Sequence, residues 1–193
     1  MPDSRRRSSV ALVVSISLLL VASCRFGDGA LDEANSLNRS AGEDIREIEK
    51  LVRENKDKEA QVTRALNAND AGRARALIDE SVQAIDRGLE KGTSAADKLA
   101  RAASLDIDAT IKEYLQLRAR SVSKAIEAFR ELRRGVLIFR ESIGTADKAA
   151  ADRAKNDIRQ ASGRFDQLIN EAGRLERQAD DLARLNPEKI KPG

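Results

Sequence analysis

Cys24 is the only cysteine in the 193-residue sequence, and the sequence contains no histidine. A single cysteine excludes an intrachain disulfide, and the lack of histidine excludes a Cys/His zinc site. A Cys–His catalytic pair and a Ser–His–Asp triad are excluded for the same reason. The chemistry that remains open to Cys24 is that of a nucleophilic sulfur, which can be alkylated to a thioether.

The residues before Cys24 have the order of a secretory signal. Three arginines at positions 5–7 form a positive segment, and an apolar run from Val10 to Leu20, interrupted only by two serines, follows them. Small residues then lead to the cysteine. This order is typical of a signal peptide, and the apolar run is shorter than the ~20 residues that span a bilayer. Residues 1–23 are therefore predicted to be removed from the mature protein.

The segment Val21-Ala22-Ser23-Cys24 resembles the lipobox of bacterial lipoproteins, in which an aliphatic residue, a small residue and Gly, Ala or Ser precede the cysteine. The resemblance implies that diacylglycerol alkylates the Cys24 thiol, that signal peptidase II cleaves before it, and that the new amine is acylated. Several acyl chains would anchor the chain stably to a membrane. The alternatives are an ordinary signal peptide with an incidental cysteine, or an uncleaved anchor helix.

The residue after the lipobox bears on the location within the cell envelope. In enterobacterial lipoproteins an aspartate at this place implies retention at the inner membrane, and here the residue is Arg25. The resemblance therefore implies the periplasmic face of the outer membrane rather than the inner membrane. Residues 24–30 are predicted to be the lipidated start and a flexible tether, residues 31–186 a helical domain, and residues 187–193 a C-terminal tail.

Four polar residues are candidates for a polar core or a ligand site. Arg118 lies on an apolar stripe with Tyr114 one turn before it, and Asn55 and Glu59 lie on a second stripe. Such residues can set the register of packed helices. Alternatively they line a pocket for a small ligand, or the stripes are rotated and the four residues face water. No metal is expected, because di-metal carboxylate bundles use Glu-x-x-His motifs, and no catalytic residue or cofactor is predicted.

The positions of apolar residues predict four long helices, because they recur at steps of three and four. The clearest stripe has the a/d rhythm of a coiled-coil seam and comprises Ala151, Ala154, Ile158, Ala161, Phe165, Leu168, Ala172, Leu175, Ala179 and Leu182. Helix N-caps are predicted at Asp70, at Asp106 or Asp108, and at Thr145. Gly92-Thr93-Ser94 is predicted to kink or break the second helix, and Asn186-Pro187 to end the fourth.

These helices predict an all-α fold, an elongated antiparallel up-down four-helix bundle with coiled-coil-like packing. The main alternative is a pair of long hairpins that completes its core only as a dimer. Both termini should lie at one end, so the turns at residues 67–70 and 144–145 would point away from the membrane, where we expect a partner. Residues 136–139 are apolar all round, which indicates a well-covered helix end or an exposed patch that binds a partner.

The net charge and the lack of catalytic residue sets limit the classes of function that we expect. The net charge is +3, and without residues 1–23 the chain keeps 32 basic and 31 acidic residues. This balance, with few aromatic residues, gives no reason to expect nucleic-acid binding. We expect a lipid-anchored protein of the cell envelope that is not an enzyme and acts as a protein-interaction or scaffold module, with another protein or a second copy of itself as partner. The alternatives are a periplasmic ligand-binding or sensory four-helix bundle, and an envelope chaperone or stress protein.

Overall fold

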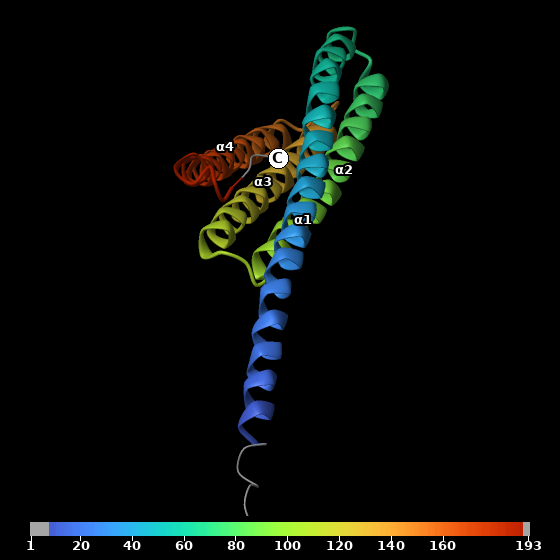
Figure 1. The fold of residues 1–193 in the computed structure, drawn as a ribbon. Coiled ribbons are helices and arrows are strands. Elements are labelled where there is room, and N and C mark those ends of the chain that lie inside the picture. The colour runs from blue at the N-terminus through green and yellow to red at the C-terminus, as the bar shows by residue number, and fades with distance from the viewer. Residues whose placement is uncertain (1–7, 191–193) are drawn as a thin grey trace, which may run out of the picture.

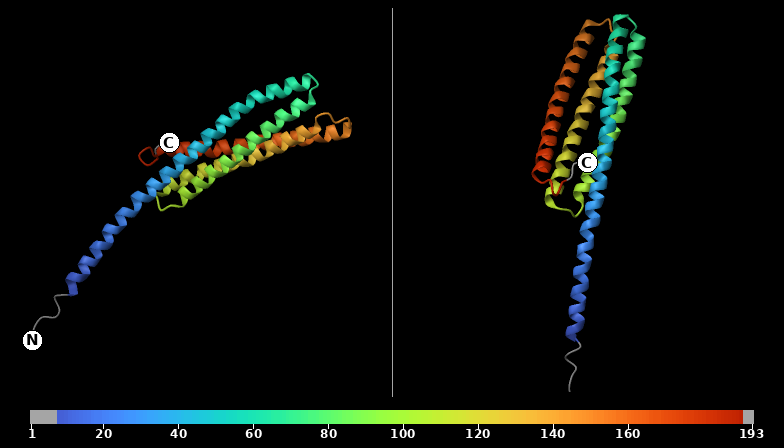
Figure 2. Two further views of the ribbon diagram at one scale, coloured as in Figure 1. Left: turned by 90° about the vertical axis from the view of Figure 1, so that its right-hand side faces the viewer. Right: turned by 45° about the horizontal axis from the view of Figure 1, so that its top comes forward.

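The computed structural model describes the backbone of residues 8–190 and the side chains of residues 29–190. It contains four α-helices: α1 (Ser8–Asn67), α2 (Ala71–Ser104), α3 (Ala109–Ser142) and α4 (Lys148–Leu185). No strand occurs within residues 8–190. Each helix runs antiparallel to the next (Figures 1 and 2). The all-α, elongated, antiparallel up-down four-helix bundle is therefore confirmed.

Short turns separate the helices, and an aspartate caps each helix that follows a turn. The Asp70 carboxylate accepts a hydrogen bond from Arg73 N at 2.8 Å, and Asp108 accepts one from Thr110 N at 2.8 Å. Both caps confirm the prediction. The cap of α4 is Asp147, which accepts from Ala149 N at 2.9 Å. The prediction of Thr145 was wrong, because two more residues follow the left-handed Gly144 before the cap at Asp147.

The bundle has two apolar cores. The proximal core lies near the α2–α3 turn, where α1 joins the bundle and α4 ends, and it takes residues from all four helices. Its buried members are Ala34, Ala41, Ala95, Leu99, Ala102, Ala103, Ile111, Tyr114, Leu115, Val122, Ile126, Ala179 and Ile190. The distal core lies near the other two turns and contains no buried residue of α4. Its buried members are Val62, Ala65, Ala74, Leu77, Ile78, Val82 and Ile143.

Residues near both ends of the described chain pack against the proximal core. Among the residues whose side chains are described, Leu31 is the first that does so. At the other end the backbone turns after Asn186, and Ile190 is only 3% exposed within the same core. The domain therefore extends to Ile190, because this apolar side chain folds back onto the bundle instead of remaining in a tail. Lys189 reinforces the turn, with Nζ 3.0 Å from Asp108 Oδ2.

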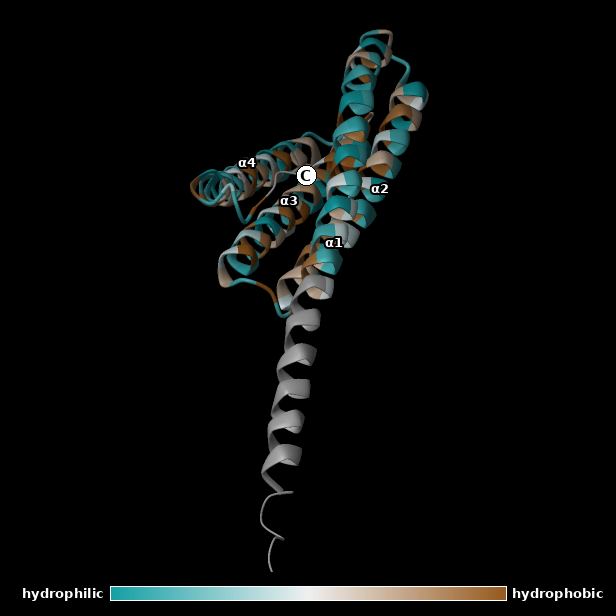
Figure 3. Ribbon diagram, in the orientation of Figure 1, coloured by the Kyte–Doolittle hydropathy of each residue, from teal (hydrophilic) through white to brown (hydrophobic). Residues whose placement is uncertain are grey.

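The predicted lipobox, Val21-Ala22-Ser23-Cys24, lies outside the residues whose side chains the structure describes. The backbone of α1 includes residues 24–30, which the sequence predicts as a tether. The outer surface of α1 within the bundle is mostly hydrophilic, as Figure 3 shows in teal. This surface agrees with the high proportion of charged residues in the sequence.

Helix α2 is continuous through Gly92-Thr93-Ser94, so the prediction that the helix breaks there was wrong. The reason is packing, because Gly92 is buried and a Cβ atom added there would lie 2.9 Å from Ile126 Cγ1 and 3.7 Å from Ile48 Cδ1. The hydroxyl of Thr93 donates to Leu89 O at 2.9 Å within the helix and starts no new cap. Gly92 is thus the point where α1 and α3 approach α2 closely.

Two glycines one turn apart in α2 should respond in opposite ways to alanine. A Cβ atom at Gly88 would meet nothing within 4 Å, so Gly88→Ala should raise the free energy of unfolding by about 0.5–1 kcal/mol through helix propensity. Gly92→Ala should lower it by about 1–2 kcal/mol, because Ile126 must move. Urea denaturation followed by circular dichroism measures both. Stabilisation by both substitutions would contradict the close approach at Gly92.

Candidate functional site

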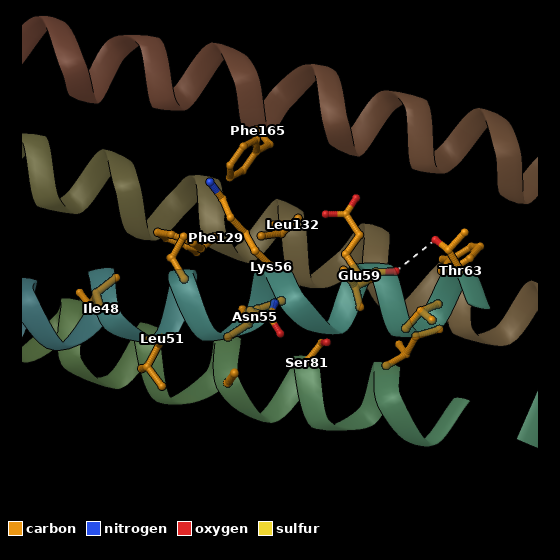
Figure 4. A pocket seen from close by; sticks show the side chains of 18 of the residues that line it. Ile48, Leu51, Asn55, Lys56, Glu59, Thr63, Ser81, Phe129, Leu132 and Phe165 are labelled. Carbon is orange, nitrogen blue, oxygen red and sulfur yellow. Dashed lines mark hydrogen bonds between the residues drawn. The ribbon is translucent and has the colours of Figure 1, made fainter. Parts of the chain in front are cut away.

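A groove of about 710 Å³ opens along the distal half of the bundle (Figure 4). Its walls are mainly apolar, and α1 and α2 supply most of the residues that line it. The lining residues are Ile48, Leu51, Val52, Asn55, Lys56, Glu59, Val62, Thr63 and Leu66 of α1; Ile78, Ser81, Ala84, Ile85 and Gly88 of α2; Phe129, Leu132, Val136 and Phe139 of α3; and Phe165 of α4. All four helices therefore contribute to one site.

The groove exists because the bundle is not closed between α1 and α4. Extensive packing joins α1 to α2, α2 to α3 and α3 to α4, but α1 and α4 do not form a comparable pair. In the distal half α4 rests on α3 alone, where the rings of Phe129 and Phe165 meet edge to face with centroids 6.3 Å apart. Both rings remain only half-buried. Apolar faces of α1 and α4 are thus left without each other as partners.

The exposed fraction of large hydrophobic side chains distinguishes the groove from most of the surface. Val52 is 39% exposed and lines the groove. Among the residues whose side chains are described, the one other large hydrophobic residue so exposed is Leu185, at 75%, which is the last residue of α4 and does not line the groove. Of the apolar run 136–139, Val136, Leu137 and Phe139 pack against the distal core, and Val136 and Phe139 also line the groove. The groove therefore brings half-exposed apolar residues of α1, α3 and α4 together on one surface.

Two of the four predicted polar candidates lie in this groove. Asn55 points from α1 towards Ser81 of α2 (Figure 4), and its buried Oδ1 has no hydrogen-bond partner among the described residues. The Ser81 hydroxyl donates instead to Leu77 O at 3.1 Å. Glu59 is exposed, and its carboxylate points to the open side of the groove. On α1, Lys56 lies one turn before Glu59 and points towards Phe129 and Phe165 in the same view.

The other two candidates lie in the closed, proximal half. Arg118 Nη1 donates to the buried Asn38 Oδ1 at 2.6 Å, and its Nε lies 3.6 Å from Glu176 Oε1. The guanidinium stands 5.7 Å from the centre of the Tyr114 ring, a distance that gives a cation–π attraction. These contacts join α1, α3 and α4, and the polar side chains that make them are paired with one another. The arrangement is that of a polar layer that sets helix register, with no cavity at Arg118 or Tyr114 among the main grooves.

A further polar cluster, around Asp44, was not singled out by the sequence as one unit. Asp44 is 7% exposed and receives Lys98 Nζ at 2.5 Å, Ser94 Oγ at 2.8 Å and Lys91 Nζ at 3.3 Å. Burial alone raises the pKa of Asp44, but these hydrogen bonds outweigh it and hold the pKa below the ordinary value of 3.8. The cluster fixes α1 against α2. The spacing of Lys91, Ser94 and Lys98 on one face of α2 was the signal available in the sequence.

Metal and membrane features can be assessed for the part of the chain that is described. Within it, no group of three or more acidic or cysteine side chains is placed to hold a metal ion. No helix in that part is both long and apolar enough to cross a membrane. Comparisons of the chain with protein-family models, with curated proteins and with solved structures found no match.

Proposed function

We propose that this protein is a lipid-anchored, non-enzymatic interaction module of the bacterial cell envelope that holds a protein partner in the groove between α1 and α4. The observation that carries the proposal is the groove, where half-exposed apolar residues of α1, α3 and α4 form one surface. Contiguous exposed apolar surface on a polar protein is a common sign of an interaction site. The anchor rests on the lipobox pattern that ends at Cys24.

The place of the groove suits a protein held at a membrane by its N-terminus. Helix α1 enters the bundle at its proximal end, near Leu31, and the groove begins at Ile48 and extends towards the turn after Asn67. A lipid on Cys24 would therefore hold the proximal end at the membrane and leave the groove on the distant half. A partner in the periplasm would reach the groove without displacing the anchor.

A small-ligand sensor is the second candidate function. The groove volume of about 710 Å³ lies within the roughly 300–1,000 Å³ typical of small-molecule pockets. Such pockets bury most of the ligand, however, whereas this groove is open along one side between α1 and α4. The Arg118–Tyr114 pair, which a sensor would use to orient a polar ligand, is engaged with Asn38 and Glu176 in the closed half. The open shape favours a macromolecular partner.

Two measurements on the protein from its own cells test the proposal. Mass spectrometry of the membrane-extracted chain should show acyl mass on an N-terminal Cys24. A photo-crosslinking amino acid at position 52, in the groove, should give a protein adduct in intact cells. The same amino acid at position 185 is the matched control, because Leu185 is exposed and apolar but lies outside the groove. An unmodified N-terminus would refute the anchor, and equal protein adducts at both positions would refute the groove as the contact surface.

A further inference from the structure

We infer that the partner presents an amphipathic α-helix of about five turns, which lies lengthwise between α1 and α4 and completes the distal half of the bundle. This inference rests on the proposed function and names the kind of partner. Its starting point is the open seam, where apolar residues of α1 and Phe165 of α4 face the same groove without packing on each other.

The length and the volume of the groove both fit an α-helix of about five turns. From Ile48 to Leu66 the α1 wall is about 27 Å long, and a helix of that length with two apolar residues in each heptad inserts about five side chains. The groove volume of about 710 Å³ holds roughly two dozen groups of the size of a water molecule, at about 30 Å³ each. That is about six side chains of the size of leucine.

The open side of the groove decides between a helix and a lipid chain. Val52, Lys56, Glu59 and Thr63 line the groove and are all exposed, so an occupant would keep one side in water. An acyl chain is apolar all round and would lose part of the benefit of burial there. An amphipathic helix inserts its apolar face and leaves its polar face in solvent.

A second copy of this chain is a poor fit for the groove. Within residues 29–190, Val52 and Leu185 are the large hydrophobic residues that are strongly exposed, and Val52 belongs to the groove itself. The large apolar residues of α4, such as Ile158 and Leu168, are half-buried, so the described part of a second copy offers no fully exposed apolar stripe to insert. Two grooves placed face to face would meet hollow to hollow.

The rim of the groove adds a charge requirement. Lys56 and Glu59 stand one turn apart on α1, both exposed and neither in an ion pair within the described residues. The flank of a partner helix that faces α1 should carry an acidic residue near Lys56 and a basic residue near Glu59, as flanking positions of coiled coils do. Such pairs contribute more to register than to affinity.

The experiment maps the adduct formed by a photo-crosslinking amino acid at position 52 of the full chain in intact cells. Mass spectrometry should place the adduct on a segment of another protein in which apolar residues recur at steps of three and four over about 18 residues. That segment, made as a fluorescent peptide, should bind the full chain and gain helical circular dichroism on binding. Val52→Lys should weaken binding about tenfold or more, whereas Leu185→Lys should leave it within about twofold.

The outcomes separate this inference from the proposed function. A protein adduct on an extended or irregular segment, or a peptide that binds without gaining helix, would overturn the helical partner and leave the interaction module standing. An adduct on a lipid, or on a second copy of this chain, would overturn the inference in favour of that occupant. The absence of any adduct at position 52 would overturn both.

Discussion

Replacing Leu99 by alanine should lower the free energy of unfolding by about 3–5 kcal/mol, the largest stability effect expected from a single substitution in this bundle. Leu99 is fully buried in the proximal core and is one of the two largest side chains with less than 2% exposure. All four helices contribute to this core, so the cavity left by the substitution has little freedom to collapse. Urea denaturation at neutral pH, followed by far-ultraviolet circular dichroism, measures the loss.

Leu132→Ala is the matched control in the distal half. The substitution removes the same side-chain atoms as Leu99→Ala. Leu132, however, lines the groove and is only half-buried. The substitution enlarges a space that already opens to solvent, so the loss should be about 1–2 kcal/mol. Equal losses for the two leucines would mean that the groove is closed in solution and would count against it as a binding surface.

The two leucines differ because the proximal half of the bundle contributes more to the free energy of unfolding than the distal half. The proximal half has a four-helix core and is closed by the Arg118 layer, whereas the distal core contains no buried residue of α4. Regions that bind partners are commonly drawn from the less stable parts of a fold. A rigid proximal half can hold α1 and α4 at a fixed separation, which leaves the distal seam ready for a partner at little cost in reorganisation.

Most of the fold could be predicted from the sequence, because helix periodicity and aspartate caps are local signals. The caps at Asp70 and Asp108 and the end of α4 at Leu185 follow from such signals. The role of a residue that depends on tertiary contacts could not be predicted from such local signals. Gly92 resembles a helix breaker in sequence, but the close approach of Ile126 explains its presence in a continuous helix.

The candidate site was only partly predictable for the same physical reason. A stripe of apolar residues indicates which face of a helix seeks a partner, but it does not say whether a neighbouring helix covers that face. Phe165 belongs to the apolar stripe predicted for the fourth helix, yet it lines the groove and is only half-buried. Asn55 and Glu59 lie in the groove of the distal half, whereas Arg118 and Tyr114 lie near the start of α3 in the proximal half.

Asp44→Asn should lower the free energy of unfolding by about 1–3 kcal/mol at neutral pH, the second large effect we expect. The carboxylate is almost fully buried and receives hydrogen bonds from Lys98, Ser94 and Lys91. Asparagine keeps the shape but loses the charge, which leaves the two ammonium groups without their shared anion. Both lysines keep some contact with water, at 29% and 48% exposed, so they can recover part of the loss.

The pH dependence distinguishes this role from simple packing. Because the folded pKa of Asp44 lies below the ordinary 3.8, the unfolded chain binds the proton more readily, and the stabilisation from Asp44 is complete above pH 3.8 and lost as the pH falls through the folded value. The difference in stability between the wild type and Asp44→Asn should therefore be constant from pH 7 to about 5 and shrink below pH 4. Asp108, whose pKa the Lys189 hydrogen bond and the Thr110 contacts lower to about 2, titrates in both proteins and cancels from that difference.

Asp181→Asn is the control for charge alone, since Asp181 is exposed and pairs with Arg184 one turn away on the same helix. It should change stability little at any pH, because exposed pairs of this kind contribute weakly. A difference for Asp44→Asn that stays constant down to pH 2 would show that the charge of Asp44 is unimportant. The contact between α1 and α2 would then depend on shape alone, and the fixed position of the groove wall would have to come from the apolar residues of the proximal core.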